Sequence, residues 1–174
     1  MRILPKILTD TWWGNALLGI VFAAIFYFLI LRLLLGTDLP MVAVVSNSMK
    51  HESTIQSTHY KWLEEKLGYN ETYINSWPVR NGFSIGDMPI IRGVEEYKVG
   101  DVIVYSVPGF SAPIIHRIIK INEDGSYQTK GDNNNGQNTR YELSVAKQQI
   151  HGKVIFVIPK LGYLKVMLNK LVGM

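Results

Sequence analysis

The apolar residues of this chain fall into one long run near the start and several short runs further on. The long run covers residues 11–31, which carry no charge and are mostly Leu, Ile, Phe, Ala and Val. Because a helix of about 20 apolar residues spans the hydrocarbon core of a bilayer, this run predicts a transmembrane helix. Trp12 and Trp13 at its start and Arg32 beyond its end are residue types that favour membrane interfaces. A cleavable signal peptide has an apolar region of only about 7 to 15 residues before a small-residue cleavage site, which does not fit here.

The short apolar runs are rich in Val, Ile and Tyr and are bounded by Gly, Pro, Asn and Asp, which is typical of β-strands. We therefore expect a mostly β fold, antiparallel, behind an N-terminal transmembrane helix. The chain then divides into residues 1–36, with the helix, and residues 37–174, with the β domain. The expected strands cover residues 42–47, 88–92, 101–107, 113–121 and 153–158.

Two segments depart from the strand pattern. Residues 51–82 form an insertion in which "STHYKWLEEKLG" predicts a short amphipathic helix that ends at Gly68, followed by a loop over residues 75–82. Residues 161–174 place their apolar side chains on one helical face. That last segment is too short and too charged to span a bilayer, and it suits either core packing or an interfacial position.

Composition and charge narrow the classes of function. The 18 Lys and Arg against 14 Asp and Glu are scattered along the chain, so the sequence does not indicate a nucleic-acid partner. The absence of cysteine excludes disulfides, Cys-based zinc sites and thiol chemistry. Arg2 and Lys6 before the apolar run favour a cytoplasmic N-terminus and an exported β domain. On an exported domain, the triplet that begins at Asn70 would be a glycosylation acceptor.

Two serines, Ser46 and Ser48, end the first predicted strand, and a serine needs a neighbouring base to become a nucleophile. His116 lies in "APIIHRIIKI", where flanking isoleucines predict that its ring is partly buried and must find a polar partner. The residues alone leave open whether His116 is a core histidine or a base. The other histidines are expected at exposed or turn positions: His51, His59 and His151.

Five motifs occur in a characteristic order: "SNSM", "IGDMPIIRG", "VGDVIVY", "IIHRIIKI" and "TKGDNN". In this combination the chain resembles type I signal peptidases, specifically the branch of archaea and the endoplasmic reticulum that uses histidine in place of the bacterial lysine. The resemblance implies a signal-peptidase-like antiparallel β domain, a serine protease mechanism, and no cofactor or metal.

The resemblance also implies roles for individual residues. Ser48 matches the nucleophile, and Ser46 matches the serine that forms the oxyanion hole together with the backbone N–H of Ser48. His116 matches the general base, since a largely neutral imidazole can accept the seryl proton at neutral pH. Asp132 matches the aspartate of the Gly-Asp-Asn motif.

One position departs from the family pattern, because Asn138 stands where a second aspartate is expected six residues after Asp132. Three accounts of the group that orients His116 follow, in this order. Asp132 orients it, or Asn138 does so with reduced effect, or a shifted loop register brings in Glu142. In a Ser-His-Asp triad, an Asp-to-Asn change lowers turnover about 10⁴-fold.

The resemblance implies a membrane-bound serine endopeptidase that cleaves signal peptides from exported preproteins. We expect an extended substrate with small side chains at the first and third positions before the cut, in pockets walled by residues 41–45. Expected partners are preproteins, membrane lipid and secretion-machinery subunits, and the expected location is the cell or endoplasmic-reticulum membrane with the β domain outside the cytoplasm. Only 13 residues separate Leu35 from Ser48, which holds the nucleophile near the membrane.

Two other classes of function compete with this expectation. One is a catalytically weak or silent relative that binds signal-bearing chains or scaffolds a secretion complex, an alternative motivated by Asn138. The other is a self-cleaving, repressor-like protease. That class uses Ser-Lys chemistry in a soluble chain, so the apolar run and His116 argue against it.

Overall fold

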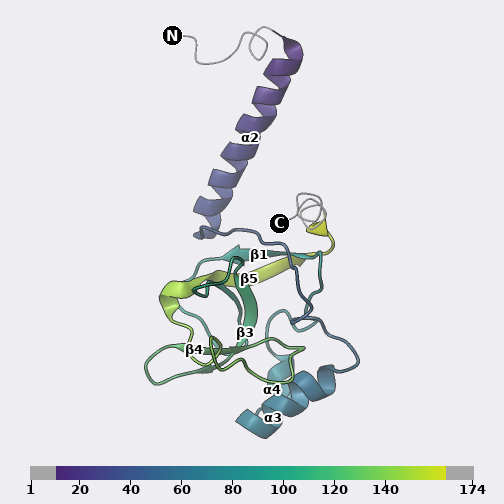
Figure 1. Cartoon of the computed structure of the whole chain (residues 1–174), viewed down its shortest axis with the longest axis vertical. Helices are drawn as coiled ribbons and strands as arrows, with labels where there is room; N and C mark the ends of the chain where they lie inside the picture. The colour runs from purple at the N-terminus through teal and green to yellow at the C-terminus, as the bar shows by residue number, and fades with distance from the viewer. Residues whose placement is uncertain (1–10, 164–174) are drawn as a thin grey trace. The chain divides into compact units, whose positions relative to one another are not determined.

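The computed structural model describes residues 11–163, and its contacts divide the chain into two compact units, residues 1–36 and 37–174 (Figure 1). Arg2 and Lys6, which favour a cytoplasmic N-terminus, lie outside the described residues. The same is true of residues 164–174, which make up most of the predicted C-terminal helix.

The first unit is a single apolar helix, α2 (Trp12–Leu35). Its 24 residues correspond to a length of about 36 Å, enough to cross a bilayer. The Thr11 side chain caps the helix by accepting a hydrogen bond from the backbone N–H of Gly14 (3.2 Å), and Gly36 ends it in the left-handed conformation (φ 59°). The predicted helix is confirmed as a candidate membrane span, and it continues four residues beyond the uncharged run.

The second unit is built on one five-stranded antiparallel sheet with the strand order β1-β5-β2-β3-β4. The mostly β, antiparallel fold is thus confirmed, with four of the predicted strands. β4 was not predicted, because "YQTK" is short and half polar. The strands are β1 (Met88–Arg92), β2 (Val102–Tyr105), β3 (Ile114–Ile121), β4 (Tyr127–Lys130) and β5 (Ile150–Ile158).

The expected strand over residues 42–47 is wrong. This segment runs beside β1 with one isolated bridge, between Met41 and Ile90, and with a backbone hydrogen bond from Val44 to Asp87 (3.0 Å). Regular pairing stops because the chain bends into a turn at residues 46–50. The segment still alternates as a strand would, so that Val42 and Val44 enter the core while Val45 is exposed.

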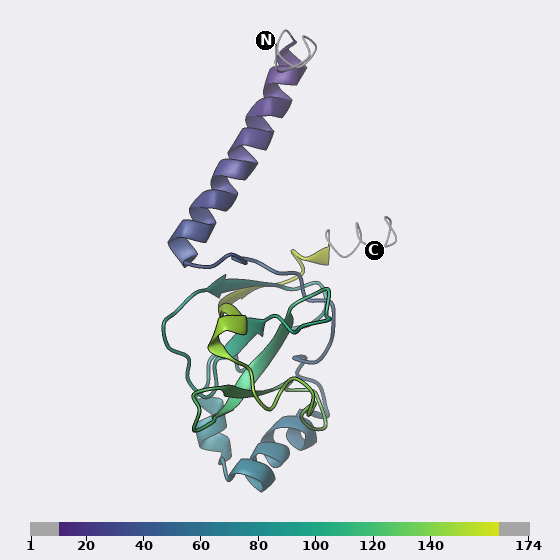
Figure 2. The ribbon, with the colours of Figure 1, turned by 60° about the vertical axis from the view of Figure 1, so that its left-hand side comes forward.

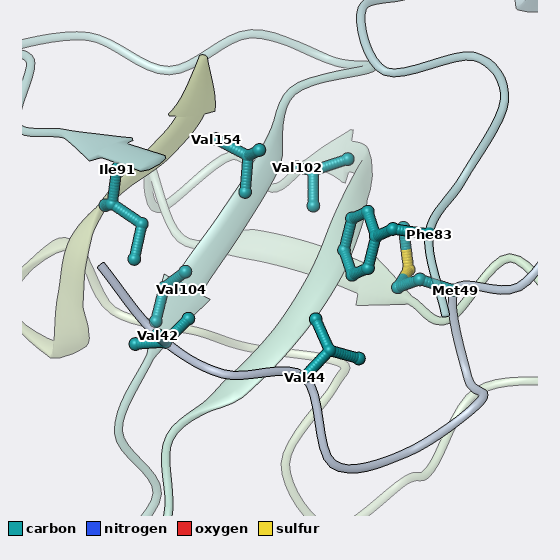
Figure 3. Close-up of a cluster of buried hydrophobic side chains, with 8 residues drawn as sticks. All are labelled: Val42, Val44, Met49, Phe83, Ile91, Val102, Val104 and Val154. Carbon is teal, nitrogen blue, oxygen red and sulfur yellow. The ribbon is translucent and has the colours of Figure 1, made fainter. Parts of the chain in front are cut away.

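Side chains cover both faces of the sheet. All four residues of β2 are buried, with Val102 and Val104 in one apolar cluster and Ile103 and Tyr105 in the other. Figure 3 shows the first cluster, in which Val42, Val44 and Met49 from the extended segment and its turn face Val102, Val104 and Phe83. The Met49 side chain is only 1% exposed, so it anchors the turn that follows the extended segment.

The insertion folds as π-helical turns at Gln56–Lys61, then α3 (Trp62–Leu67) and α4 (Glu71–Asn75). The predicted helix and its stop are confirmed, since Gly68 ends α3 with φ 70°. α4 was not predicted; the Asn70 side chain begins it by accepting a hydrogen bond from the backbone N–H of Tyr73 (2.8 Å). Both views show α3 and α4 together at the end of the β domain away from β1 (Figure 1, Figure 2). They pack there through Leu63 and Ile74, together with Trp77 just after α4, onto Ile119 of β3.

Candidate functional site

Ser48 occupies a β-turn that closes with a hydrogen bond from the backbone N–H of Lys50 to the carbonyl of Asn47 (3.0 Å). Its hydroxyl lies 3.2 Å from that of Ser46, within hydrogen-bond distance. Among residues 11–163, no group accepts a hydrogen bond from the backbone N–H of Ser48. The turn therefore places two hydroxyls and one free N–H donor close together, as an oxyanion site requires.

Ser48 and His116 border the same cavity, of about 520 Å³. One wall is the extended segment of residues 41–46, and the other is residues 112–116, which lead into and begin β3. Most of the lining side chains are apolar, as in sites that hold an extended, partly apolar ligand. His116 and the two serines thus line one cavity, and among residues 11–163 the Ser48 hydroxyl lies within hydrogen-bond distance of Ser46 rather than of the histidine.

The Nδ1 atom of His116 lies 2.5 Å from Oε1 of Glu142, and both side chains are almost fully buried. The pair has the distance of an ion pair without the angles of an aligned hydrogen bond. Neither atom has a hydrogen-bond partner among the described residues. Burying a polar group costs free energy unless it has a partner. We infer that the contact between His116 and Glu142 offsets this cost for both side chains. The prediction that the isoleucines of this strand bury His116 at least in part is confirmed, since the residue is only 5% exposed.

Glu142 is placed by the edge of the sheet and by Asn138. Its carbonyl accepts a hydrogen bond from the backbone N–H of Thr129 in β4 (2.8 Å), and Val145 forms an isolated bridge with Tyr127 of the same strand. The other carboxylate oxygen of Glu142 accepts a hydrogen bond from the backbone N–H of Asn138. Asn138, at the position where the resemblance implies a second acid, thus binds the carboxylate of Glu142 through its backbone. It is Glu142, and not the side chain of Asn138, that contacts His116.

Asp132 was expected first among the three candidate acids, and its carboxylate contacts other groups. It accepts hydrogen bonds from Nε (2.9 Å) and Nη2 (2.7 Å) of Arg117, and from Nε2 of His51 (2.9 Å). Burial by itself raises the pKa of Asp132, but the charge of Arg117 and these hydrogen bonds outweigh it and hold the pKa well below its usual range. The order of the candidate acids is therefore revised, with Glu142 in contact with His116. Arg117 and His116 are neighbours on β3 whose side chains point to opposite faces, so the two carboxylates serve different faces of the sheet.

The exposed positions expected for His51 and His59 are also wrong. His59 is 3% exposed, with Nδ1 3.4 Å from Oδ1 of Asp132, and the side chain of His51 is largely buried. Burial lowers the pKa of His59 to about 4, in spite of the attraction of Asp132. Sequence reasoning missed this pairing because the insertion brings the two histidines to Asp132 across some 80 positions of the chain. Within residues 11–163, no cluster of His, Asp and Glu side chains is arranged to hold a metal ion.

Lys130, directly before Gly131-Asp132, is a second buried cation. Its ammonium group donates hydrogen bonds to the carbonyls of Thr58 (2.6 Å) and Gly131 (2.9 Å) and lies 5.2 Å from the ring centre of Trp62. Burial lowers the pKa of Lys130 to about 8. Since its donors are directed at backbone carbonyls, Lys130 supports the loop of Asp132 and is not a base for Ser48.

Gly131 lies between His116 and the Ser48 turn, where there is no room for a side chain. A Cβ atom at this position would lie 2.9 Å from Nε2 of His116, 2.9 Å from the carbonyl oxygen of Ser48 and 2.7 Å from Nδ2 of Asn134. The absence of a side chain therefore permits the approach of the His116 ring and the Ser48 turn.

A second set of Ser, His and Asp side chains lies elsewhere on the β domain. Nε2 of His151 is 2.7 Å from Oγ of Ser106, and its Nδ1 is 2.9 Å from Asp38. The backbone N–H of Ser106 donates to the carbonyl of Gln149 (2.9 Å), so it is not free to bind an oxyanion. None of the three residues borders the cavity at Ser48. This set ties the segment after Gly36 to the sheet.

The fold and the site together define a class: an antiparallel β domain behind an apolar helix, with a candidate Ser-His-Glu site on the rim of an apolar cavity. No protein-family model matches the sequence. Over 98 residues the chain is 33% identical to the signal peptidase complex catalytic subunit SEC11 of Chaetomium globosum and 35% identical to that of Metarhizium robertsii. Each match covers 51% of this chain and 57% of the relative. The SEC11 subunit of Pyricularia oryzae is 34% identical over 84 residues, which are 44% of this chain and 49% of the relative.

These relatives support the assignment of the chain to the endoplasmic-reticulum type of the signal peptidase I family. The chain spans about half the length of the curated relatives that it matches.

Proposed function

We propose that this protein is a membrane-anchored serine endopeptidase that removes signal peptides from exported preproteins. One observation carries the proposal: Glu142 contacts Nδ1 of His116, and the His116 ring and Ser48 border one cavity. The similarity to catalytic subunits of signal peptidase complexes supports the choice of substrate class.

In the first step, Nε2 of His116 takes the proton of the Ser48 hydroxyl as its oxygen attacks the carbonyl carbon before the cleaved bond. Glu142 keeps the proton of the neutral ring on Nδ1, so that Nε2 is free to act as the base. It then stabilises the imidazolium that forms. This is the role of the acid in a Ser-His-Asp triad, in which the acid does not itself take up the proton.

The negative charge that develops on the carbonyl oxygen is stabilised by the hydroxyl of Ser46 and the backbone N–H of Ser48. Preorganised donors of this kind are worth about 3 to 4 kcal/mol each in the transition state. The intermediate collapses when the imidazolium gives its proton to the leaving amine, which departs as the new N-terminus of the mature chain. Water, deprotonated by the same ring, then hydrolyses the acyl group from Ser48.

The substrate lies along the extended segment of residues 41–46 as an added strand. The partial pairing of this segment with β1 supports such a mode, because recognition by strand addition draws on backbone groups that the sheet does not use. Small side chains before the cut would fit the apolar cavity, whose lining includes Ala43, Val45 and Ile115.

The apolar helix supports a location in a membrane. Arg2 and Lys6, which precede it in the sequence, support a β domain outside the cytoplasm. We place the protein in the endoplasmic reticulum or in a cell membrane, as the catalytic subunit of an assembly, because the relatives are named as subunits of signal peptidase complexes. Signal-bearing preproteins and membrane lipid are the proposed partners.

The test is cleavage of a radiolabelled preprotein by the full-length protein in detergent or membrane vesicles. We expect cleavage after a small residue, complete loss in Ser48→Ala, and retention in Ser106→Ala, which removes the serine that is hydrogen-bonded to His151. Cleavage that persists in Ser48→Ala would refute the assignment. Signal-peptide binding without cleavage by the wild type would favour a silent relative that scaffolds secretion.

A further inference from the structure

We propose that Asp132 is a positioning residue that fixes the turn of the nucleophile through His51, and that the insertion of residues 51–82 stabilises this contact. The turn in question is Ser46–Lys50, called the nucleophile turn below. The inference rests on the proposed function only in taking Ser48 as the nucleophile.

The carbonyls of the nucleophile turn are held mainly from one loop. The Asn133 backbone N–H donates to the carbonyl of Ser48 (2.7 Å), and its side chain Nδ2 donates to that of Asn47 (3.2 Å). The next carbonyl, of Met49, accepts from the backbone N–H of Phe83 (3.0 Å). The orientation of the Ser48 hydroxyl therefore depends on where Asn133 lies.

His51 connects the end of the nucleophile turn to Asp132, the neighbour of Asn133. Its Nε2 lies 2.9 Å from Oδ2 of Asp132, and its side chain is only 15% exposed. The turn and the loop are thus joined twice, once through the backbone at Asn133 and once through the side chains of His51 and Asp132. Hydrogen bonds to a buried carboxylate are stronger than those between neutral groups.

The insertion supplies the groups that hold Asp132 in place. Arg117, which pairs with Asp132, donates its remaining guanidinium hydrogens to the carbonyls of Pro78 (2.7 Å), Val79 (3.1 Å) and Gly100 (2.8 Å). Thr54 donates to the side chain of Asn133 (3.0 Å). Contacts from both ends of the insertion therefore meet around one carboxylate.

The insertion also closes on itself beside the nucleophile turn. Lys50, directly before the insertion, and Gly82, its last residue, form an isolated antiparallel bridge. Gly82 has φ 61°, and a Cβ atom there would collide with the carbonyl of Met49 and the ring of His51. Both ends of the insertion thus lie beside Met49 and Lys50, at the end of the nucleophile turn.

The test compares His51→Ala, His51→Gln and the control His151→Ala, whose histidine also pairs with an aspartate but lies outside the site. Amide hydrogen exchange of the full-length protein in detergent reports on the contact directly. We expect exchange at Asn133 to rise roughly tenfold in His51→Ala, to return toward the wild-type rate in His51→Gln, whose amide can still donate to Asp132, and to stay unchanged in His151→Ala. Exchange at Ile118, whose amide bonds to Asp101, serves as an internal reference.

Preprotein cleavage supplies the second readout. We expect His51→Ala to lower kcat roughly tenfold while KM stays within about twofold, because the cavity wall is intact and only the nucleophile is displaced. A change in KM alone, unchanged exchange at Asn133, or faster exchange without a fall in kcat would each overturn the inference. If the variants show the expected exchange at Asn133 but the wild-type protein does not cleave a preprotein, the proposed function is refuted while the contact between His51 and Asp132 is established.

A second variant covers the case in which His51→Ala does not fold. Asn133→Ala keeps the backbone hydrogen bond to Ser48 but removes the side-chain contacts to Asn47 and Thr54. We expect it to lower kcat in the same direction by a smaller factor, and full activity in this variant would also overturn the inference.

Discussion

The carboxylate of Glu142 lies 2.5 Å from Nδ1 of His116, four residues beyond the position at which the signal peptidase family would place its second acid. Asn138 occupies that position and donates its backbone N–H to the same carboxylate. The loop therefore supplies an acid to His116 from Glu142 instead of from position 138. The absence of the expected aspartate does not by itself imply a silent enzyme.

Replacement of this acid is the most direct test of its role. We expect Glu142→Gln to lower kcat/KM for preprotein cleavage by about 10² to 10⁴, because an amide at Nδ1 favours the wrong tautomer of His116. Steady-state kinetics with a signal-peptide substrate measures the change. Asn138→Asp should alter kcat/KM by less than about threefold, since His116 already has its acid. A large gain in Asn138→Asp, from a nearly inactive wild type, would instead favour the silent alternative.

Gly131 offers a test of close approach within the site. We expect Gly131→Ala to lower kcat roughly tenfold or more, because its Cβ atom would lie 2.9 Å from both Nε2 of His116 and the Ser48 carbonyl. Gly136→Ala is the matched control in the same loop, since its Cβ would meet nothing nearer than the Trp62 ring nitrogen at 3.9 Å. Equal activities of the two variants would show that the geometry around Gly131 is not critical.

The buried His59 predicts how stability depends on pH. Its pKa is about 4 in the folded protein, below the ordinary value of 6.5, because burial disfavours the charged ring. The charges of Arg117, Lys130 and His51 add to this effect, and the attraction of Asp132 opposes it without offsetting it. The unfolded chain therefore binds a proton first as pH falls, and the free energy of unfolding should decrease between pH 6.5 and 4 by on the order of 3 kcal/mol. Below that window the loss should continue, since the depressed pKa of Asp132 also favours the folded state only while the carboxylate is ionised.

Thermal unfolding of the full-length protein in detergent at pH 7, 5.5 and 4 measures this dependence. His59→Asn cannot take up a proton, so its unfolding temperature should fall less than that of the wild type over the same range. Parallel curves for the two proteins would contradict the assignment of the effect to His59.

Lys130 predicts a cost in stability rather than in chemistry. We expect Lys130→Met to destabilise the protein by about 3 kcal/mol, because the buried carbonyls of Thr58 and Gly131 lose their donor. Lys153→Met, which breaks a partly exposed pair with Asp101, should cost about 1 kcal/mol or less. Chemical denaturation of the two variants beside the wild type measures the difference. Similar losses of stability in the two variants would mean that water replaces the ammonium group of Lys130 as the donor to these carbonyls.

Several features follow from local pattern and needed no tertiary structure. The uncharged run predicts α2, and the Val- and Ile-rich runs predict four strands of the sheet, because periodicity and length are properties of a single segment. The position of His116 amid isoleucines predicts its burial for the same reason. β4 escaped prediction because "YQTK" is stabilised by its neighbours in the sheet rather than by its own composition.

The partners of buried charges are a different matter. Glu142 is the first acidic residue after Asp132 in the sequence, which marked it as a candidate but could not rank it above Asp132. That ranking depends on which face of β3 each carboxylate meets, and the alternation of His116 and Arg117 along the strand separates the two acids. By itself, the sequence determined the apolar helix, the mostly β domain and the residue types of the site. Only the tertiary structure decided which acid pairs with which base, because hydrogen bonds and ion pairs act over a few ångströms and their partners here are distant in the chain.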